Sequence, residues 1–169
     1  MPSTTRTTAA VENIRRTRAR TQSYLEDLTT DEWFWCPSEL TTHIAWQVGH
    51  LAVSQYNLCM RRLRGRIPED EKLISDSFIE VFKLGSTPLA DPAGNPPLEE
   101  IRSVFAAVQN HAIAELSALT DDELNVPVEQ PHPVFKTKLE AVEYSWPHEL
   151  VHIGQIALLR RLMGKRPLR

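Results

Sequence analysis

Apolar residues recur along most of the chain at the three- and four-residue spacings of an amphipathic helix. Such stripes run over residues 7 to 28 and 98 to 119, and a third runs over residues 138 to 164. A further stripe over residues 38 to 64 is followed at once by a glycine, a common residue just beyond a helix. Strand-like alternation is rare by comparison. The pattern therefore predicts an all-α domain with four long helices.

The connections between these stripes carry most of the prolines. Residues 70 to 84 are compatible with a short helix, which a proline-rich loop over residues 86 to 97 follows, and a second loop spans residues 125 to 137. The aromatic segment Trp33–Pro37 is expected to close one end of the core. Because no repeat of 20 to 50 residues is present, the four helices predict a four-helix bundle instead of a solenoid.

Pro147 lies inside the last helical stripe. A proline there removes one backbone donor and clashes with the preceding turn. We therefore expect either a kink near Trp146 or a helix that begins only there.

Composition places the chain among ordinary globular proteins. Its 169 residues suit a single domain, with residues 1 to 8 as a flexible tail, and its 41% hydrophobic content excludes full disorder. The net charge of -3 argues against nucleic acid as a partner. No apolar stretch is long enough for a membrane span or a signal peptide. Two cysteines without paired spacing, Cys36 and Cys59, favour core positions in a cytoplasmic protein.

Arginines gather at residues 15 to 20, 61 to 66 and 160 to 169. In a chain with net negative charge, such groups are typical of solvated faces or helix ends. The group at 61 to 66 lies at the far end of its helix, up to about 20 Å from His50 by axial rise. We therefore do not assign it to an anionic substrate from the sequence.

Three histidines are candidates for a metal site. His148 and His152 are one helical turn apart, so both imidazoles project from one face within reach of a single ion. The spacing alone is weak evidence in a chain with six histidines, and it needs a third ligand. His50 borders the apolar stripe of another helix and could supply it across a bundle interior. The residues alone leave open a metal triad or isolated core histidines held by hydrogen bonds.

The same segment satisfies the H-E-x-x-H pattern, in which two histidines bind zinc and the glutamate acts as general base. No histidine, aspartate or glutamate follows His152 as a downstream third ligand, which argues against a metalloprotease. Glu149 lies about 100° around the helix from His148. We expect it to be a solvated carboxylate or one that supports a ligand from behind.

Further polar and aromatic residues fall near these histidines. Gln155 continues their stripe and could orient a ligand or substrate, or bond to a neighbouring helix from a buried position. Trp46 and His43 share the stripe of His50, and His43 lies about 10 Å away along the axis, too far to share an ion. We expect His43 at the mouth of a pocket. The remaining histidines, His111 and His132, are expected to be exposed.

Taken together, these segments resemble the DinB/YfiT-like superfamily of metal-dependent enzymes over nearly the whole chain. The segments that carry the resemblance are Trp46–Leu51, Asp121–Leu124, His148–Ile156 and Leu158–Gly164. Each is generic alone, and their order and spacing are specific. The resemblance implies an up-down-down-up bundle with a long crossover between the second and third helices, often as a homodimer.

The resemblance also implies a site and a chemistry. By position, His50, His148 and His152 would bind nickel or zinc, the usual ions of the family. Characterised relatives include thiol S-transferases that use bacillithiol and isomerases that use mycothiol. We therefore expect a thiol S-transferase-like enzyme that takes a small-molecule substrate and a low-molecular-weight thiol. The alternatives are a metal-dependent hydrolase that uses a bound hydroxide and a non-catalytic bundle that binds a small molecule.

Overall fold

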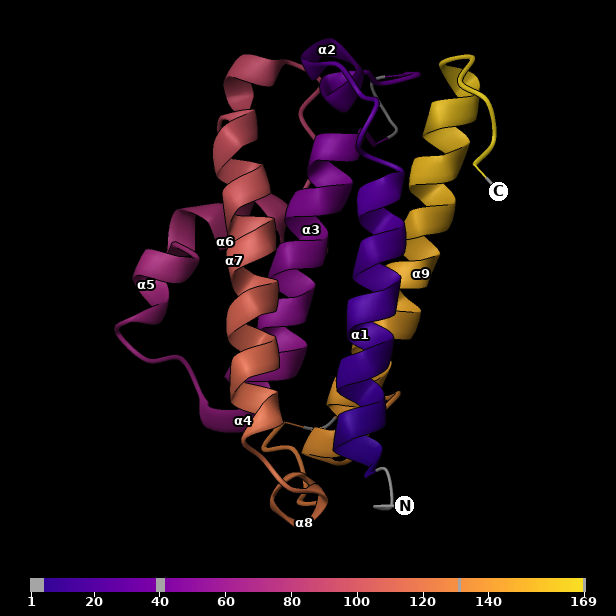
Figure 1. Cartoon of the computed structure of the whole chain (residues 1–169). Coiled ribbons are helices and arrows are strands. Elements are labelled where there is room, and N and C mark those ends of the chain that lie inside the picture. Colours follow the sequence, from indigo (N-terminus) through magenta and orange to yellow (C-terminus); the bar gives the residue numbers. More distant parts are fainter. Residues whose placement is uncertain (1–4, 39–41, 131, 169) are drawn as a thin grey trace.

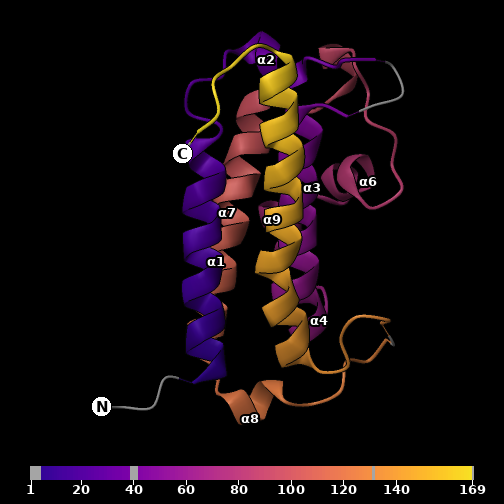
Figure 2. The same cartoon turned by 90° about the vertical axis from the view of Figure 1, so that its right-hand side faces the viewer.

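Four long helices form the body of the computed structural model, which describes residues 5–38, 42–130 and 132–168 (Figure 1). They are α1 (Arg6–Ser23), α3 (Ile44–Tyr56), α7 (Leu98–Ser117) and α9 (Lys138–Leu162). Helices α1 and α9 run in one direction, and α3 and α7 run in the other (Figures 1 and 2). This confirms the predicted four-helix bundle and its up-down-down-up order.

The long crossover follows from this order, because α3 and α7 both run down and the chain must return along the bundle between them. It follows α4 (Arg62–Arg64), which continues α3, and contains α5 (Asp70–Leu73), α6 (Asp76–Phe82) and a short 3-10 turn (Pro92–Gly94). The short helix predicted for residues 70 to 84 is therefore two helices. Helix α6 packs against α3 through the buried rings of Phe78 and Phe82.

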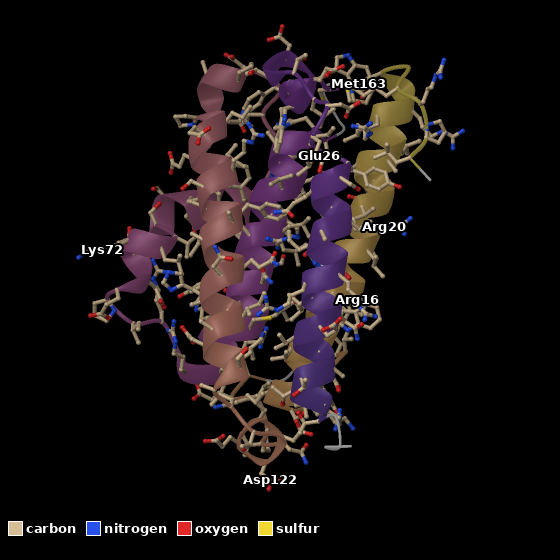
Figure 3. The ribbon with its side chains drawn as sticks, viewed as in Figure 1. Arg16, Arg20, Glu26, Lys72, Asp122 and Met163 are labelled. Atoms are coloured by element: carbon tan, nitrogen blue, oxygen red, sulfur yellow. The ribbon has the colours of Figure 1, made fainter. Side chains whose placement is uncertain are left out.

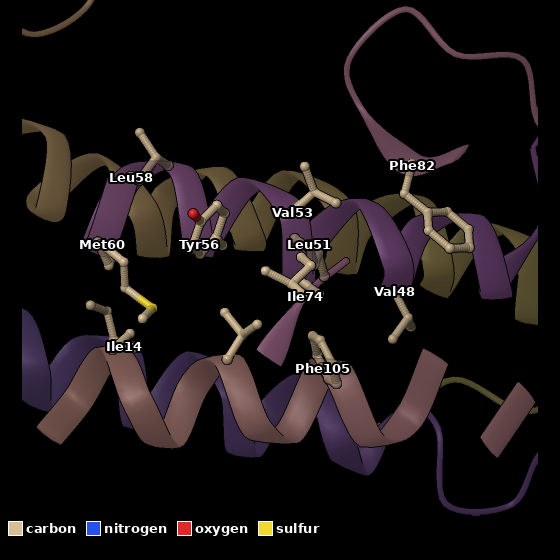
Figure 4. Close-up of a cluster of buried hydrophobic side chains, with 14 of the residues drawn as sticks. Ile14, Val48, Leu51, Val53, Tyr56, Leu58, Met60, Ile74, Phe82 and Phe105 are labelled. Carbon is tan, nitrogen blue, oxygen red and sulfur yellow. The ribbon is translucent and has the colours of Figure 1, made fainter. Parts of the chain in front are cut away.

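One hydrophobic core fills the space between the helices (Figure 4). Val48 and Leu51 of α3, Phe105 of α7 and Ile14 of α1 all contribute buried side chains to it. The short helix α2 (Thr30–Phe34) buries Trp33 and Phe34 at one end of the bundle, as predicted for the aromatic segment. No helix in the described part of the chain has the length and apolar character that crossing a bilayer requires.

The first helix differs from its predicted bounds at both ends. Asp121 accepts hydrogen bonds from the backbone N–H groups of Arg6 (2.9 Å) and Thr7 (2.8 Å), which satisfies donors of the first turn. Residues 6 to 8 are therefore helical and not a tail, and residues 1 to 4 lie outside the described residues. At the other end α1 stops at Ser23 instead of continuing to residue 28.

The second long helix begins at Ile44, six residues later than the predicted start at Ser38. The side chain of His43 caps it, because Nδ1 accepts a hydrogen bond from the backbone N–H of Trp46 (3.2 Å). Residues 39–41 of the expected first turn lie outside the described residues. The helix continues through a π-helical segment, Asn57–Arg61, and α4, and it ends at Gly65 as predicted.

The last helix is continuous across Pro147, so the prediction that it begins only near Trp146 is wrong. Most of its apolar stripe is buried or half-buried, but Leu150, an apolar residue of that stripe, is 41% exposed, whereas the neighbouring Glu149 is buried. The apolar pattern did not predict the buried Glu149, because its carboxylate binds a buried arginine of α1 that is described below.

Gly49 allows α6 to approach α3 closely. A Cβ atom at this position would lie 2.5 Å from ring carbons of Phe82, well inside van der Waals contact. The carbonyl of Phe82 also accepts a hydrogen bond from His50, so this approach connects the crossover to the histidines.

Replacing Gly49 with alanine is expected to lower the free energy of unfolding by about 1–3 kcal/mol, because the Phe82 ring must move. Gly154→Ala is the matched control, since nothing lies within 4 Å of a Cβ atom there. That change should stabilise the helix by up to about 1 kcal/mol. Urea denaturation measures both, and a Gly49→Ala variant as stable as the parent chain would contradict the close contact.

Candidate metal centre

Three histidines from two helices meet between α3 and α9. His50 comes from α3, and His148 and His152 come from successive turns of α9. One ring nitrogen from each lies within 4.8 Å of the others, and the Nε2 atoms of His148 and His152 are 3.3 Å apart. Among the described residues this is the one group of three such side chains that could hold an ion. The structure thus brings together all three residues that the sequence singled out.

The orientation of His50 is set by three neighbours. Its Nδ1 lies 2.8 Å from the carbonyl oxygen of Phe82, and because a carbonyl only accepts, Nδ1 carries the proton. This leaves a lone pair on Nε2, toward which the Ser54 hydroxyl is directed at 3.2 Å. The indole of Trp46 stacks on the imidazole with ring centroids 4.9 Å apart and planes 6° apart.

His152 is held in the same way by Gln47, a residue that the sequence analysis missed. The Nδ1 atom of His152 donates to Oε1 of Gln47, and Nε2 of Gln47 donates to the Thr42 hydroxyl at 3.0 Å. Gln47 is 1% exposed, so this amide has no solvent to bind instead. Gln47 precedes His50 by three residues, which places both side chains on one face of α3. This spacing could have indicated Gln47 as a neighbour of the histidines.

The donor set fits a divalent transition metal. Two nitrogens bound to one tetrahedral ion at about 2.0–2.1 Å lie about 3.3 Å from each other, the separation found between His148 and His152. Outer acceptors on Nδ1, such as Phe82 and Gln47 supply, are typical of metal-binding histidines. Imidazole suits nickel and zinc alike, so the donor set favours neither.

The histidines are neutral at pH 7 because they are buried beside one another. Burial, followed by the neighbouring His50, lowers the pKa of His148 to about 4. Burial, followed by His148 and His50, lowers the pKa of His152 to about 3. Burial also lowers the pKa of His50. Neutral imidazole is the form that binds metal, so little proton release opposes binding at neutral pH.

Glu149 is neither solvated nor directed at the histidines, in contrast to both sequence-based expectations. Its carboxylate accepts hydrogen bonds from Nε (2.9 Å) and Nη2 (3.2 Å) of Arg18 and from the Thr21 hydroxyl, all on α1. Arg18 is only 1% exposed and also donates to the Phe105 carbonyl and to Gln55. The glutamate of the H-E-x-x-H pattern is therefore a structural anion, which removes the general base of a metalloprotease.

Other arginines of the predicted solvated groups also have carboxylate partners. Arg64 binds Asp70 and Glu115, and Arg160, which is 3% exposed, binds Asp27. Arg16, which pairs with Glu12 on the helix surface, and Arg20 do lie on the exposed side of α1, as predicted (Figure 3). Sequence clustering alone did not separate these two kinds of arginine.

The remaining candidates fall in different places. His43 is fully buried as the cap of α3, so its predicted place at a pocket mouth is wrong. Gln155 is exposed on α9 and has no hydrogen bond to the histidines, so it is not the buried or supporting amide that we expected. His111 is exposed as predicted, whereas His132 is half-buried and stacks on Phe135 at 3.8 Å. Cys59 is a core residue as predicted, and burial raises its pKa to about 12.

Comparison with known proteins identifies relatives of this arrangement. The model of the DinB superfamily matches residues 13–156. Among solved structures, YfiT from Bacillus subtilis, described as "a probable metal-dependent hydrolase with an unusual four-helix bundle topology", superposes with a TM-score of 0.59. The two chains are 22% identical, and the match covers 95% of this chain and 89% of YfiT. At this identity the likeness shows a shared fold. No curated protein matches the chain.

Reconstitution with zinc or nickel is expected to give about one bound ion per chain, held by the three imidazoles. Alanine at His50, His148 or His152 should each weaken binding, and the triple variant should abolish it. His111→Ala is the control, because that histidine is exposed and is not a member of the cluster. Elemental analysis after desalting measures the stoichiometry. An unchanged metal content in the triple variant would contradict the assignment.

Acidification is expected to destabilise the metal-free protein between about pH 7 and pH 4. Unfolded histidines take up protons near pH 6.5, whereas His148 and His152 stay neutral in the fold until about pH 4 and 3. The unfolded state then binds more protons, so the free energy of unfolding rises with pH in this window. Urea denaturation across the window should give a shallower slope for His148→Gln/His152→Gln than for the parent chain. Equal slopes would show that these histidines are not buried in neutral form.

Proposed function

Because the chain belongs to the DinB superfamily, we propose that it is a metal-dependent enzyme in which His50, His148 and His152 hold a divalent ion. The observation that carries the proposal is the meeting of three neutral imidazoles whose ligand nitrogens lie within 4.8 Å of one another. His148 is half-buried, so one edge of the cluster faces the side from which a small molecule would arrive.

A divalent ion in this place supplies positive charge that lowers the pKa of a thiol or water molecule and so provides a nucleophile near neutral pH. Three neutral imidazoles do not offset that charge. The nearest buried carboxylate, Glu149, is already neutralised by Arg18. The protein environment therefore favours an anionic nucleophile at the histidines.

We propose that this nucleophile is a low-molecular-weight thiol and that the reaction transfers it to an electrophilic small molecule. A thiol starts from a pKa near 8.5, so a modest lowering is enough to produce the thiolate at neutral pH without a protein base. Glu149 cannot serve as such a base while it binds Arg18 and Thr21. The chain's own contribution is to orient His50 and His152 through Phe82 and Gln47.

Hydrolysis is the second candidate, and the description of YfiT as a probable metal-dependent hydrolase favours it. Water would then take the place of the thiol as nucleophile. A non-catalytic bundle that binds a small molecule differs from both enzymes, because its ligand would bind without turnover and independently of chelation.

The ultraviolet absorbance of a low-molecular-weight thiolate, followed against pH, tests the preferred candidate. With the metal-loaded protein in excess, the apparent pKa of the thiol should fall below its value in free solution. Metal-free protein and the metal-treated His50→Ala variant are the controls, and both should leave the pKa unchanged. An unchanged thiol pKa together with metal-dependent ester or amide hydrolysis would replace the transferase with the hydrolase.

A further inference from the structure

A second polar site lies at the opposite end of α3 from His43, where the helix becomes π-helical. A pocket of about 450 Å³ opens there, in the size range of small-molecule sites. Its walls include Asn57, Arg61, Arg62 and Arg66 from one side and Glu129 from the loop that precedes α9. Asn57 and Arg61 are the first and last residues of the π-helical segment, a form of helix that is frequent at functional sites.

The arginines of this pocket differ in whether they are paired. Arg66 binds Glu71 and Asp76, so its charge is already neutralised. Within the described residues, no carboxylate lies within ion-pair distance of Arg61 or Arg62. The pocket wall thus contains two unpaired guanidinium groups, those of Arg61 and Arg62, against the single exposed carboxylate of Glu129.

Arg62 is held in place although it has no anionic partner. It is half-buried, and its guanidinium carbon lies 4.9 Å from the centre of the Phe135 ring. Such stacking on an aromatic ring restricts the planar fork that binds carboxylate or phosphate with two hydrogen bonds. The amide of Asn57 adds a neutral donor to the same wall. An anionic ligand would supply the ion-pair partner that this fixed cation lacks.

We propose that this pocket binds the carboxylate or phosphate group of a small molecule, with Arg61 and Arg62 as its ion-pair partners. The site has no histidine in its wall, so its occupation requires no metal.

Contacts lead from this pocket back to the three histidines. Arg62 stacks on the Phe135 ring, whose centroid lies 5.9 Å from that of Tyr144. The Tyr144 centroid lies in turn 6.0 Å from that of His148. Along the helix, Arg61 and Arg62 follow His50 by eleven and twelve residues, or about 16–18 Å of axial rise. If the proposed function holds, the substrate class follows: an elongated small molecule with its anionic group at one end and its reacting atom at the other.

Isothermal titration calorimetry tests the anion site. Metal-free protein, prepared with a chelator, is titrated with inorganic phosphate and, separately, with succinate, which distinguishes a phosphate site from a carboxylate site. Saturable binding of at least one probe is expected at low ionic strength. Arg61→Gln and Arg62→Gln should each weaken it about tenfold, and the double variant should lose it. Arg61 is exposed, so its replacement does not endanger the fold. Arg15→Gln, an exposed arginine of α1, is the matched control and should bind as the parent chain does.

Two further measurements separate this proposal from the proposed function. His50→Ala should bind the probe unchanged, and a loss of binding there would overturn the anion site in favour of an anion at the histidines. No binding of either probe, or equal affinity in the double arginine variant, would also overturn it. For an active protein, Arg62→Gln should raise KM about tenfold for a carboxylated substrate and leave its amide analogue unaffected. Binding of phosphate or succinate by a protein that shows no metal-dependent turnover would contradict the proposed function and still support the anion site.

Discussion

Every polar group that the bundle buries needs a partner, and the ion pair of Arg18 with Glu149 is the contact on which the rest depends. Their side chains are 2% and 4% exposed, so neither charge has water to bind. Loss of one partner would strand the other at a cost of about 3–5 kcal/mol. The pair turns one face of α9 toward α1. Because residues 148 and 152 lie on a different face, the same rotation directs the two histidines toward α3.

The histidine cluster follows the same rule on a smaller scale. The Gln47 Oε1 atom and the Phe82 carbonyl accept hydrogen bonds from the Nδ1–H groups of His152 and His50, which leaves the lone pairs of both rings on Nε2. The Phe82 carbonyl reaches His50 because Gly49 lets α6 approach. The neutral tautomers, and the 3.3 Å spacing of the His148 and His152 nitrogens, therefore exist before a metal binds.

Features set by spacing along the chain were predictable, and features set by a partner across the bundle were not. Periodicity gave the four helices, and the resemblance supplied their order and the three histidines. The inward turn of Glu149 was missed, because only the buried Arg18 of another helix explains it. Gln47 was missed for the same reason, since its partner is 105 residues away. Helix α3 begins late because the side chain of His43 caps it. As a cap His43 is buried at the helix end, and it therefore does not lie at the mouth of a pocket as predicted.

The protein presents His50 and His152 as neutral imidazoles with their protons on Nδ1 before any metal binds. Heteronuclear NMR of the imidazole nitrogens in the metal-free protein near pH 7.5 reads this directly, because it separates the two neutral tautomers and the charged form. The structure predicts neutral rings with Nδ1–H for both residues. Charged rings, or neutral rings with the proton on Nε2, would contradict the claim.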